Sequence, residues 1–503
     1  MELSTAIRAV LATLRQRPSD LIPLYFLIFG VPAIARVLTF VGVAALWMYL
    51  AVTGRLGALL DLMETMDVSP PDPAATPEET IEWFEQFEPI IEILVTPTSA
   101  TIVVLAIAAS VILAIILAAA VEAAQLAGCV ARLRQERGLI GGIRGARMHW
   151  VGFLGLYLLE LLLWVVVTLV VAVLIGVVAI FSLAAAVLLG VFLLFAWLAA
   201  MILIRAVFAF APVAIVVDNV SVLQSIRRSI GYIRGDLMGA VGYYAISIGV
   251  LIGFISFTSV VAPIGAATLA GIVGTLIVTP ALHLLKTVLY GDYRGAVSPL
   301  SQPEVGMYQQ TRVGFKRSVD ELIQFVKGSP GLHALAFLTL LVGFIVGWVL
   351  IAPLEGVITT SIRSRLVGFI PPVKTLELFG NNWGVGISAA FSGIAFTIPA
   401  ISILFSNGIV LGSVARLEVE PEVLLAFVVP HGLVEFPAAI IAGALGFQLG
   451  ISAWRSWRGH QHPSELADDL ERAYWVVLGL ALVFAVAALI EAFISPFYWR
   501  LFL

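Results

Sequence analysis

Residues 421–449 read PEVLLAFVVPHGLVEFPAAIIAGALGFQL, an apolar run that is long enough to cross a bilayer and that carries two ionisable side chains near its middle. In a helix, residues four apart share one face, so His431 and Glu435 are expected to lie together, close to the middle of the membrane. Pro437 has no N–H to donate to the carbonyl of Leu433, which predicts a kink at this point. The stretch therefore predicts a kinked membrane helix with a polar patch at membrane depth.

The composition of the whole chain is that of a polytopic integral membrane protein. Of its 503 residues, 61% are hydrophobic and 12% are charged, and the mean hydropathy is +1.06. Soluble domains usually carry about a quarter of charged residues. We therefore predict an all-α fold, a multi-pass helical bundle in the cell membrane, with the lipid bilayer as its first partner.

Apolar runs of sufficient length predict about eleven membrane spans, six in the N-terminal half and five in the C-terminal half. The N-terminal runs lie near 21–50, 99–127, 150–178, 181–215, 236–258 and 262–285. The C-terminal runs lie near 333–353, 383–405, 421–449 and 474–495, with an ambiguous stretch at 399–416. In that stretch Ser406-Asn407-Gly408 either turns the chain between two short passes, which we favour, or interrupts one pass as in the discontinuous helices of transporters.

The charge of the loops predicts the orientation of the chain and its domains. Loops 128–149, 216–235 and 286–332 carry arginine and lysine, whereas loop 51–98 is acidic and has a single basic residue, Arg55. Because basic loops stay in the cytoplasm, the N-terminus is expected inside and the acidic loop outside. The predicted parts are a six-span domain at 1–290, a cytoplasmic linker with a basic amphipathic helix at 291–330, and a five-span domain at 331–503.

Amphipathic segments are expected at both membrane surfaces. Basic ones near 4–17, 221–234 and 312–327 suit the cytoplasmic surface, where they meet anionic lipid. In the acidic loop, Thr76-Pro77-Glu78-Glu79 has the pattern of a capping box and predicts an acidic amphipathic helix.

Ionisable side chains within the N-terminal spans need partners, since each costs at least roughly 2.5–3.5 kcal/mol at membrane depth. These residues are Arg36, Glu122, Glu160 and Arg205. Two charges of each sign allow mutual neutralisation, and we expect the two arginines to point inward toward the two glutamates. Ion pairs that fix the register of the bundle are a simpler explanation than a transport pathway.

The C-terminal spans hold His431, Glu435 and Glu491 without an obvious lysine or arginine at membrane depth. Glu435 must pair with His431, reach water or stay protonated. These arrangements fit a proton-linked switch, because histidine changes its charge near neutral pH, and they equally fit a hydrogen bond that locks two helices together. Asn381 and Asn407, from other segments, complete the polar cluster expected around His431 and Glu435.

The sequence has no convincing catalytic set, and we predict no catalytic residue, no metal site and no cofactor. His431 and Glu435 place two metal ligands on one face, but no HExxH motif accompanies them, and GxSxG and Walker A motifs are absent. The single cysteine, Cys129, excludes an intramolecular disulfide framework and a Cys-rich metal site. The net charge of −4 argues against nucleic-acid binding.

Gly343 with Gly347, and Gly446 with Gly450, are glycines spaced four residues apart within apolar runs. Small residues at this spacing let membrane helices approach closely. In a chain with 44 glycines, they indicate compact packing more than a specific dimer.

Residues of about 330–500 resemble the stage II sporulation protein M (SpoIIM) family of membrane proteins. The matching pattern comprises Asn381-Asn382 before a glycine-rich span, Asn407-Gly408 with Gly412, Pro430-His431-Gly432 with Glu435, and Glu491 before Pro496. The resemblance implies a five-span module without a defining enzymatic activity and, in spore-forming bacteria, a scaffold that assembles cell-wall hydrolases. Archaeal and non-sporulating relatives are mostly of unknown function. The N-terminal half only loosely resembles uncharacterised six-span domains.

Three hypotheses for the function follow. The first is a non-enzymatic membrane scaffold or remodelling protein, with other membrane or envelope proteins, or a second copy of the chain, as partners. The second is a transporter or channel that uses a polar site around His431 and Glu435. The third, which has the least support, is an intramembrane metallohydrolase.

Overall fold

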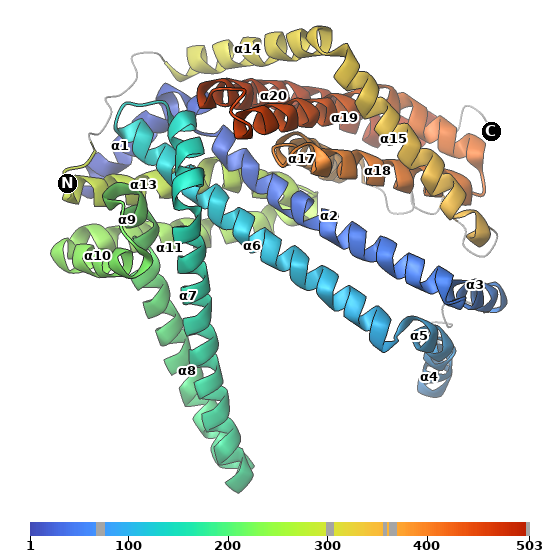
Figure 1. Ribbon diagram of the computed structural model, residues 1–503, viewed down its shortest axis with the longest axis horizontal. Helices are drawn as coiled ribbons and strands as arrows, with labels where there is room; N and C mark the ends of the chain where they lie inside the picture. The colour runs from blue at the N-terminus through green and yellow to red at the C-terminus, as the bar shows by residue number, and fades with distance from the viewer. Residues whose placement is uncertain (67–75, 298–305, 356–359, 362–369, 499–503) are drawn as a thin grey trace.

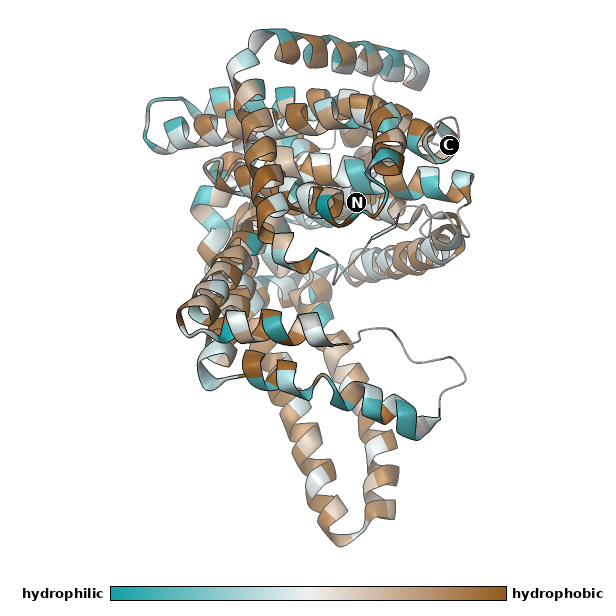
Figure 2. Ribbon diagram, turned by 90° about the vertical axis from the view of Figure 1, so that its right-hand side faces the viewer, coloured by the Kyte–Doolittle hydropathy of each residue, from teal (hydrophilic) through white to brown (hydrophobic). Residues whose placement is uncertain are grey.

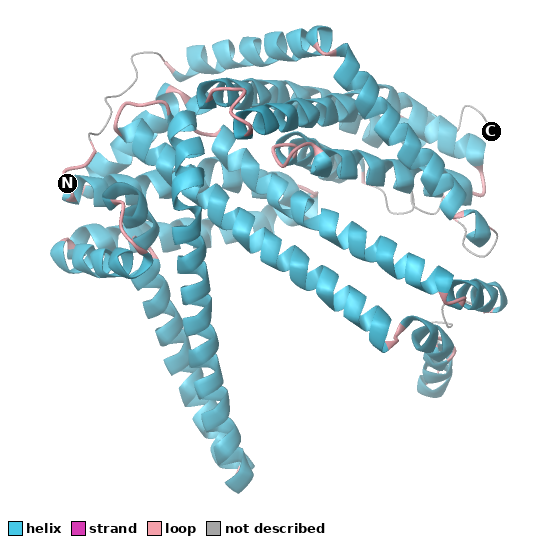
Figure 3. Ribbon diagram, viewed as in Figure 1, coloured by secondary structure: helices cyan, strands magenta, loops and turns pink. Residues whose placement is uncertain are grey.

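The computed structural model describes residues 1–66, 76–297, 306–355, 360–361 and 370–498. Within these ranges the chain is helical and contains no strand, only one isolated bridge between Thr360 and Glu418 (Figure 3). The predicted all-α class is therefore confirmed.

The N-terminal half forms two long hairpins and a set of shorter helices (Figure 1). Its helices are α1 (Leu3–Gln16), α2 (Pro23–Val52), α3 (Arg55–Thr65), α4 (Pro77–Glu85), α5 (Glu88–Leu94), α6 (Pro97–Leu133), α7 (Gly138–Phe181), α8 (Leu183–Phe208), α9 (Ala211–Asp218), α10 (Val222–Gly235), α11 (Leu237–Val261), α12 (Ala267–Val273) and α13 (Thr279–Tyr293). A π-helical segment at Gly274–Val278 joins α12 to α13, so that residues 267–293 form one span.

The C-terminal half is a layered bundle crossed by one amphipathic helix (Figure 1). Its helices are α14 (Met307–Gly328), α15 (Pro330–Leu350), α17 (Pro371–Ser392), α18 (Ile398–Leu417), α19 (Pro421–Trp457), α20 (Pro463–Phe493) and α21 (Ser495–Tyr498). Helix α14 lies along α20, where Arg317 pairs with Glu471 at 3.1 Å and stacks 4.9 Å from the ring centre of Trp475.

Ten helices in the described part of the chain are long and apolar enough to cross a membrane, against the eleven predicted. The helix that falls short is α17, because its first half carries polar side chains, namely Lys374, Glu377, Asn381 and Asn382. Six of these candidate spans lie before residue 300 and four after it.

The turn predicted at Ser406-Asn407-Gly408 lies elsewhere. Helix α18 runs without interruption through these residues, and Asn407 donates from its amide to the carbonyl of Ile403 at 2.8 Å. The chain instead turns at 393–397, where Phe396 and Thr397 have φ values of 57° and 74°. An Asn-Gly pair fits a turn locally, but here the glycine is used for helix contact: a Cβ on Gly408 would overlap the carbonyl oxygen of Leu340 in α15.

The two halves share one apolar interior. Phe26 of α2 is fully buried and stacks on Phe391 of α17 at 4.9 Å between ring centres, with Tyr474 of α20 at its edge, 5.9 Å away. At Gly30 the backbones approach so closely that a Cβ would lie 2.9 Å from the Cα of Ser392. Aromatic pairs of this geometry add about 0.5–1.5 kcal/mol beyond the burial of their area, so the halves form a single packed unit.

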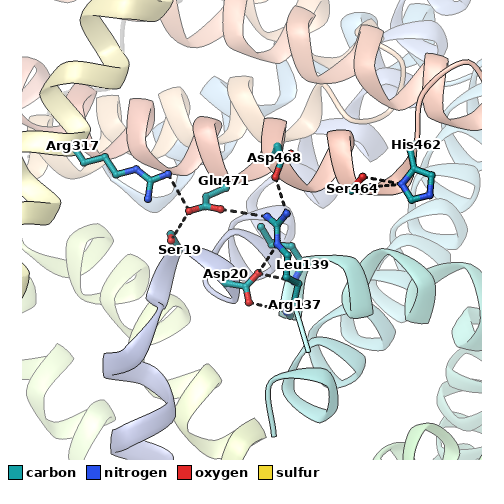
Figure 4. Close-up of polar contacts among 10 residues, drawn as sticks. Ser19, Asp20, Arg137, Leu139, Arg317, His462, Ser464, Asp468 and Glu471 are labelled. Atoms are coloured by element: carbon teal, nitrogen blue, oxygen red, sulfur yellow. Dashed lines mark hydrogen bonds and ion pairs between the residues drawn. The ribbon is translucent and has the colours of Figure 1, made fainter. Parts of the chain in front are cut away.

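A polar network joins the halves at the ends of their helices (Figure 4). Glu471 of α20 accepts from the hydroxyl of Ser19 at 2.8 Å and pairs with Arg137 at 3.4 Å, in addition to Arg317 of α14. Arg137 also bonds to Asp468 at 2.8 Å. Burial lowers the pKa of Arg137, but its hydrogen bond to Asp468 and the charges of Asp468, Asp20 and Glu471 outweigh it and raise the pKa.

The α7–α8 hairpin stands apart from the other helices (Figure 1), and it is apolar along its length (Figure 2). The most apolar stretch of α7 has a mean hydropathy of 3.2 with 0% of its residues buried. In water such a surface would be unstable, so the hairpin requires lipid or another membrane protein around it.

Candidate functional site

The polar patch of residues 430–437 lies in the first half of α19. The helix begins with Pro421 in its first turn and continues through Pro430 and Pro437 as far as Trp457. His431 therefore lies about 15 Å along the helix from its start. Its side chain is buried, and its ring meets the edge of Phe427 with 5.5 Å between ring centres.

His431 and Glu435 are joined by Glu491, which lies near the end of α20. One ligand atom from each of the three side chains lies within 4.8 Å of the other two. Ser495 of α21 places its hydroxyl 3.0 Å from Nδ1 of His431. The four residues thus connect the first half of α19 to the end of α20 and to α21, and we call them the His431 cluster.

The electrostatics of the His431 cluster are unbalanced. Neither Glu435 nor Glu491 forms an ion pair with a lysine or arginine in the part of the chain that the structure describes. Oxygen Oε2 of Glu435 is shielded from solvent and has no hydrogen-bond partner there. A buried carboxylate oxygen without a partner is costly, so this position favours a proton or a cation.

Asn381 and Asn407 lie outside the His431 cluster, although the sequence pattern placed them in it. They line a separate cavity of about 760 Å³ between the two halves, together with Arg36 of α2. Its apolar wall includes Phe29, Pro32 and Ile403. Its further polar residues are Ser388, Ser406, Thr268 and Thr275. We call this space the Arg36 cavity.

The His431 cluster lies within a segment that comparison with known proteins identifies. Residues 336–496 match the family model of stage II sporulation protein M. The searches of curated proteins and of solved structures gave no match. The SpoIIM segment runs from α15 to α21 and includes His431, Glu435 and Glu491.

Arg36 is the only residue of the Arg36 cavity with a basic side chain, and it lies on the N-terminal side of the contact with the SpoIIM segment. It is exposed to the cavity and forms no ion pair within the described ranges. Because it lies about 20 Å along α2 from Pro23, its guanidinium stands at membrane depth without a carboxylate beside it.

The remaining membrane charges form pairs, but not all of them as predicted. Arg205 pairs with Glu160 at 3.2 Å. Glu122 pairs with Lys286 at 3.6 Å and accepts a hydrogen bond from the hydroxyl of Tyr157, rather than meeting an arginine. Residues 286–332 were predicted to be a loop, but α13 continues to Tyr293 and carries Lys286 inward.

Ser495 was also missed. It follows Glu491 by four residues, the spacing that places two side chains on one helix face, and this spacing was the available signal. Serine is common on apolar membrane helices because it allows close packing, so this spacing identifies Ser495 as a site residue only once His431 is known to lie opposite it.

Proposed function

We propose that the protein is a non-enzymatic membrane scaffold that holds partner proteins of the membrane or envelope through its α7–α8 hairpin. The isolation of this hairpin carries the proposal. The most apolar stretches of its two helices have 0% and 6% of their residues buried, whereas the corresponding stretch of Pro463–Tyr498 has 39%. The corresponding stretches of α6 and α11 are as little buried, at 6% and 0%, but the hairpin also stands apart from the other helices (Figure 1), so the rest of the chain leaves both of its helices uncovered.

A scaffold needs a surface that is rigid and accessible at membrane depth. Helices α7 and α8 are long, pack against each other, and are fixed at their base, where the N–H groups of Gly138 and Leu139 bond to Asp20 at 2.8 and 3.4 Å. Because lipid and apolar side chains are equally apolar, a partner helix would bind there through close packing rather than through a hydrophobic drive. The assembly role implied by the resemblance to the SpoIIM family agrees with this proposal.

Site-specific photo-crosslinking in native membranes tests the scaffold. A photoreactive residue at Val173 or Phe195, which are 60% and 67% exposed on the hairpin, is expected to give discrete protein adducts. Matched positions on the SpoIIM segment, Leu338 and Val486 at 52% and 49%, are expected to give lipid adducts only. An adduct of twice the chain mass identifies a second copy as the partner. Lipid adducts alone at all four positions would overturn the proposal.

The scaffold is proposed to sit in the cell membrane with its N-terminus and basic loops in the cytoplasm, as the distribution of arginine and lysine favours. Single cysteines introduced at Glu82 and Glu136, both exposed, test this orientation. A membrane-impermeant maleimide is expected to label Glu82→Cys in intact cells and Glu136→Cys only after permeabilisation. The opposite pattern would invert the topology.

A second candidate function, the transport of an anionic amphiphile, is favoured by the Arg36 cavity. A lone guanidinium at membrane depth beside both polar and apolar walls suits a lipid-like molecule with a phosphate or carboxylate. The cavity includes neither His431 nor Glu435, so this candidate no longer depends on that pair. Uptake of a labelled anionic lipid into proteoliposomes is expected to fall in Arg36→Gln and to persist in Arg55→Gln; equal rates would remove the candidate.

A further inference from the structure

We propose that His431, Glu435 and Glu491 bind one divalent metal ion, which clamps α19 to α20 at the end of the hairpin opposite their connecting loop. The sequence alone predicted no metal site, because no HExxH motif accompanies His431 and Glu435. The proposal is independent of the scaffold function and of the Arg36 cavity.

The first argument is geometric. The three ligand atoms lie within 4.8 Å of one another. Zinc binds histidine nitrogen and carboxylate oxygen at about 2.0–2.2 Å in tetrahedral sites, so two such ligands stand about 3.4 Å apart. A shift of about 1 Å in two flexible glutamate side chains closes the site around an ion. His431 is also oriented by the hydroxyl of Ser495 at 3.0 Å, the kind of second contact that fixes the ring of a metal-binding histidine.

The second argument is the balance of charge. Two glutamates face each other in a partly buried site, and no lysine or arginine side chain pairs with either of them in the described residues. Oxygen Oε2 of Glu435 has no hydrogen-bond donor there although solvent does not reach it. A divalent cation neutralises both carboxylates at once and supplies the missing partner.

The third argument concerns position. The loop at 458–462 joins α19 and α20, and from this loop His431 and Glu491 are each about 40 Å away along their helices. When a loop connects two long helices at one end, a link at the other end stabilises their packing most. Gly432, next to His431, and Pro496, next to Ser495, are buried, so the site is enclosed by packed residues on both sides.

The donor set limits the identity of the ion. One imidazole with two carboxylates suits Zn²⁺, Mn²⁺ or Fe²⁺, whereas Mg²⁺ and Ca²⁺ prefer sites made of oxygen alone and Cu⁺ prefers thiolates and thioethers. We commit to Zn²⁺ as the first ion to test, with Co²⁺ as its spectroscopic substitute.

The test uses the full chain, purified in detergent without a histidine tag, treated with a chelator and then dialysed against Zn²⁺. Mass spectrometry of the metal content is expected to give one zinc per chain, and zinc is expected to raise the melting temperature. His431→Gln, Glu435→Gln and Glu491→Gln are each expected to reduce zinc affinity by more than 100-fold, and Ser495→Ala by about 10-fold to 100-fold.

Two matched controls separate this site from adventitious binding. Glu422→Gln changes an exposed glutamate in the first turn of the same helix, and the double change His460→Gln with His462→Gln removes the histidines of the connecting loop. Both are expected to keep one zinc and the increase in melting temperature. Where a cluster variant fails to fold, the visible spectrum of the Co²⁺-loaded wild type shows whether imidazole and carboxylate groups bind the ion, because a tetrahedral site of this kind has strong absorption.

Zinc content below 0.1 per wild-type chain, or an unchanged zinc affinity in Glu435→Gln and Glu491→Gln, would overturn the proposal. Loss of zinc in the loop-histidine double variant would do the same. If Glu435→Gln instead raises the melting temperature in a chain that takes up no metal, the two carboxyl groups share a proton and the clamp is a hydrogen bond.

Discussion

Asp20 is the most heavily bonded acidic residue at the base of the α7–α8 hairpin. Its carboxylate is buried, accepts from two N–H groups in the first turn of α7, and lies 3.5 Å from Arg132 and 3.7 Å from Arg137. It thus satisfies N–H groups that have no partner within the helix and meets the positive end of the helix dipole.

Asp20→Ala is therefore expected to lower the free energy of unfolding by about 3–5 kcal/mol, because Arg132, also buried, is left without its carboxylate. Unfolding of the purified protein by denaturant measures this change. Asp468→Ala is the control: this carboxylate also pairs with Arg137 but its side chain is 64% exposed, and a loss of about 0–1 kcal/mol is expected. Similar losses in both variants would contradict the prediction.

At the same scale, the sequence predicted which ionisable residues need partners but not which partner each would take. The ion pair between Glu160 and Arg205 followed from the need to neutralise charge at membrane depth. The pair of Glu122 with Lys286 was not predicted, because hydropathy alone placed the lysine beyond the end of a span. Helix α13 continues past Lys286 and carries it inward. Pairing depends on how far helices extend and how they rotate, which are tertiary properties.

Helices α15 and α18 approach each other closely. A Cβ on Gly343 or Gly347 of α15 would overlap a carbonyl oxygen of α18, at Phe405 and Ile409 respectively. Gly412 of α18 stands in the same relation to Phe344 of α15. Four glycines, two from each helix, thus bring the backbones together, which is the packing that spaced small residues allow in membranes.

Gly347→Ala is expected to destabilise the protein by about 1–3 kcal/mol, since the added methyl group must push α15 from α18. Gly331→Ala, in the first turn of the same helix, is the control, because a Cβ there has no neighbour within 4 Å. Thermal unfolding of both variants in the same detergent measures the difference. If Gly331→Ala were as destabilising as Gly347→Ala, the close approach of α15 and α18 would not explain the effect, since alanine itself favours the helix more than glycine does.

The spaced glycines of α15 were visible in the sequence, but their partner was not. In α18, Asn407-Gly408 has the local pattern of a turn, and only the neighbouring helix reveals that Gly408 serves close approach. The pair Gly446 and Gly450 of α19 likewise packs against the turn at 393–397, and no sequence pattern in that turn predicted this contact. Sequence periodicity predicts that helices exist, whereas the pairing of their faces depends on segments far away in the chain.

Helix α4 offers a test at the level of one element. The predicted capping box is present: the N–H of Thr76 donates to Oε2 of Glu79 at 2.7 Å, and the N–H of Glu79 donates to the hydroxyl of Thr76 at 3.2 Å. The backbone N–H and then the hydroxyl of Thr76 lower the pKa of Glu79. Because the pKa is lower in the folded helix, the stabilisation is complete above the ordinary pKa of glutamate and is lost as pH falls through the lowered value.

Hydrogen exchange of the α4 amides, corrected for intrinsic rates, is therefore expected to speed up as the pH falls below the ordinary glutamate range. Thr76→Ala is expected to speed it about fivefold at neutral pH, the typical effect of a lost N-cap. The same variant is expected to remove most of the acid dependence. An unchanged acid dependence in Thr76→Ala would show that the other carboxylates of the segment control it.

For the whole molecule, the amino-acid composition was sufficient to predict the fold class but not the arrangement of the helices. Apolar runs predicted a helical membrane protein, and the polar and glycine pattern of the C-terminal half predicted a SpoIIM segment; the helices and the family match agree with both. The count of eleven spans is not confirmed, since the first half of α17 is polar and this helix is not among the ten that are apolar enough to cross a membrane. The contact between the halves could not be predicted, because Phe26 and Phe391 are ordinary apolar residues in their own segments and only the assembled fold stacks them.

That contact leads to a prediction about the intact protein. If the halves form a single packed unit, a protease site placed between residues 297 and 306 can be cut without separating them, and a tag on one half is expected to recover both. Phe26→Ala removes a fully buried ring between α17 and α20, at a cost of about 3–5 kcal/mol, so the cut halves are expected to associate about 10²-fold to 10³-fold more weakly. Phe40→Ala, on the same helix but 41% exposed, is expected to leave recovery unchanged.

Separation of the cut wild-type halves would mean that the linker, rather than the shared interior and the network around Glu471, holds them together. Joint recovery that Phe26→Ala does not reduce would place the binding energy in that polar network, and high salt would then be expected to release the halves.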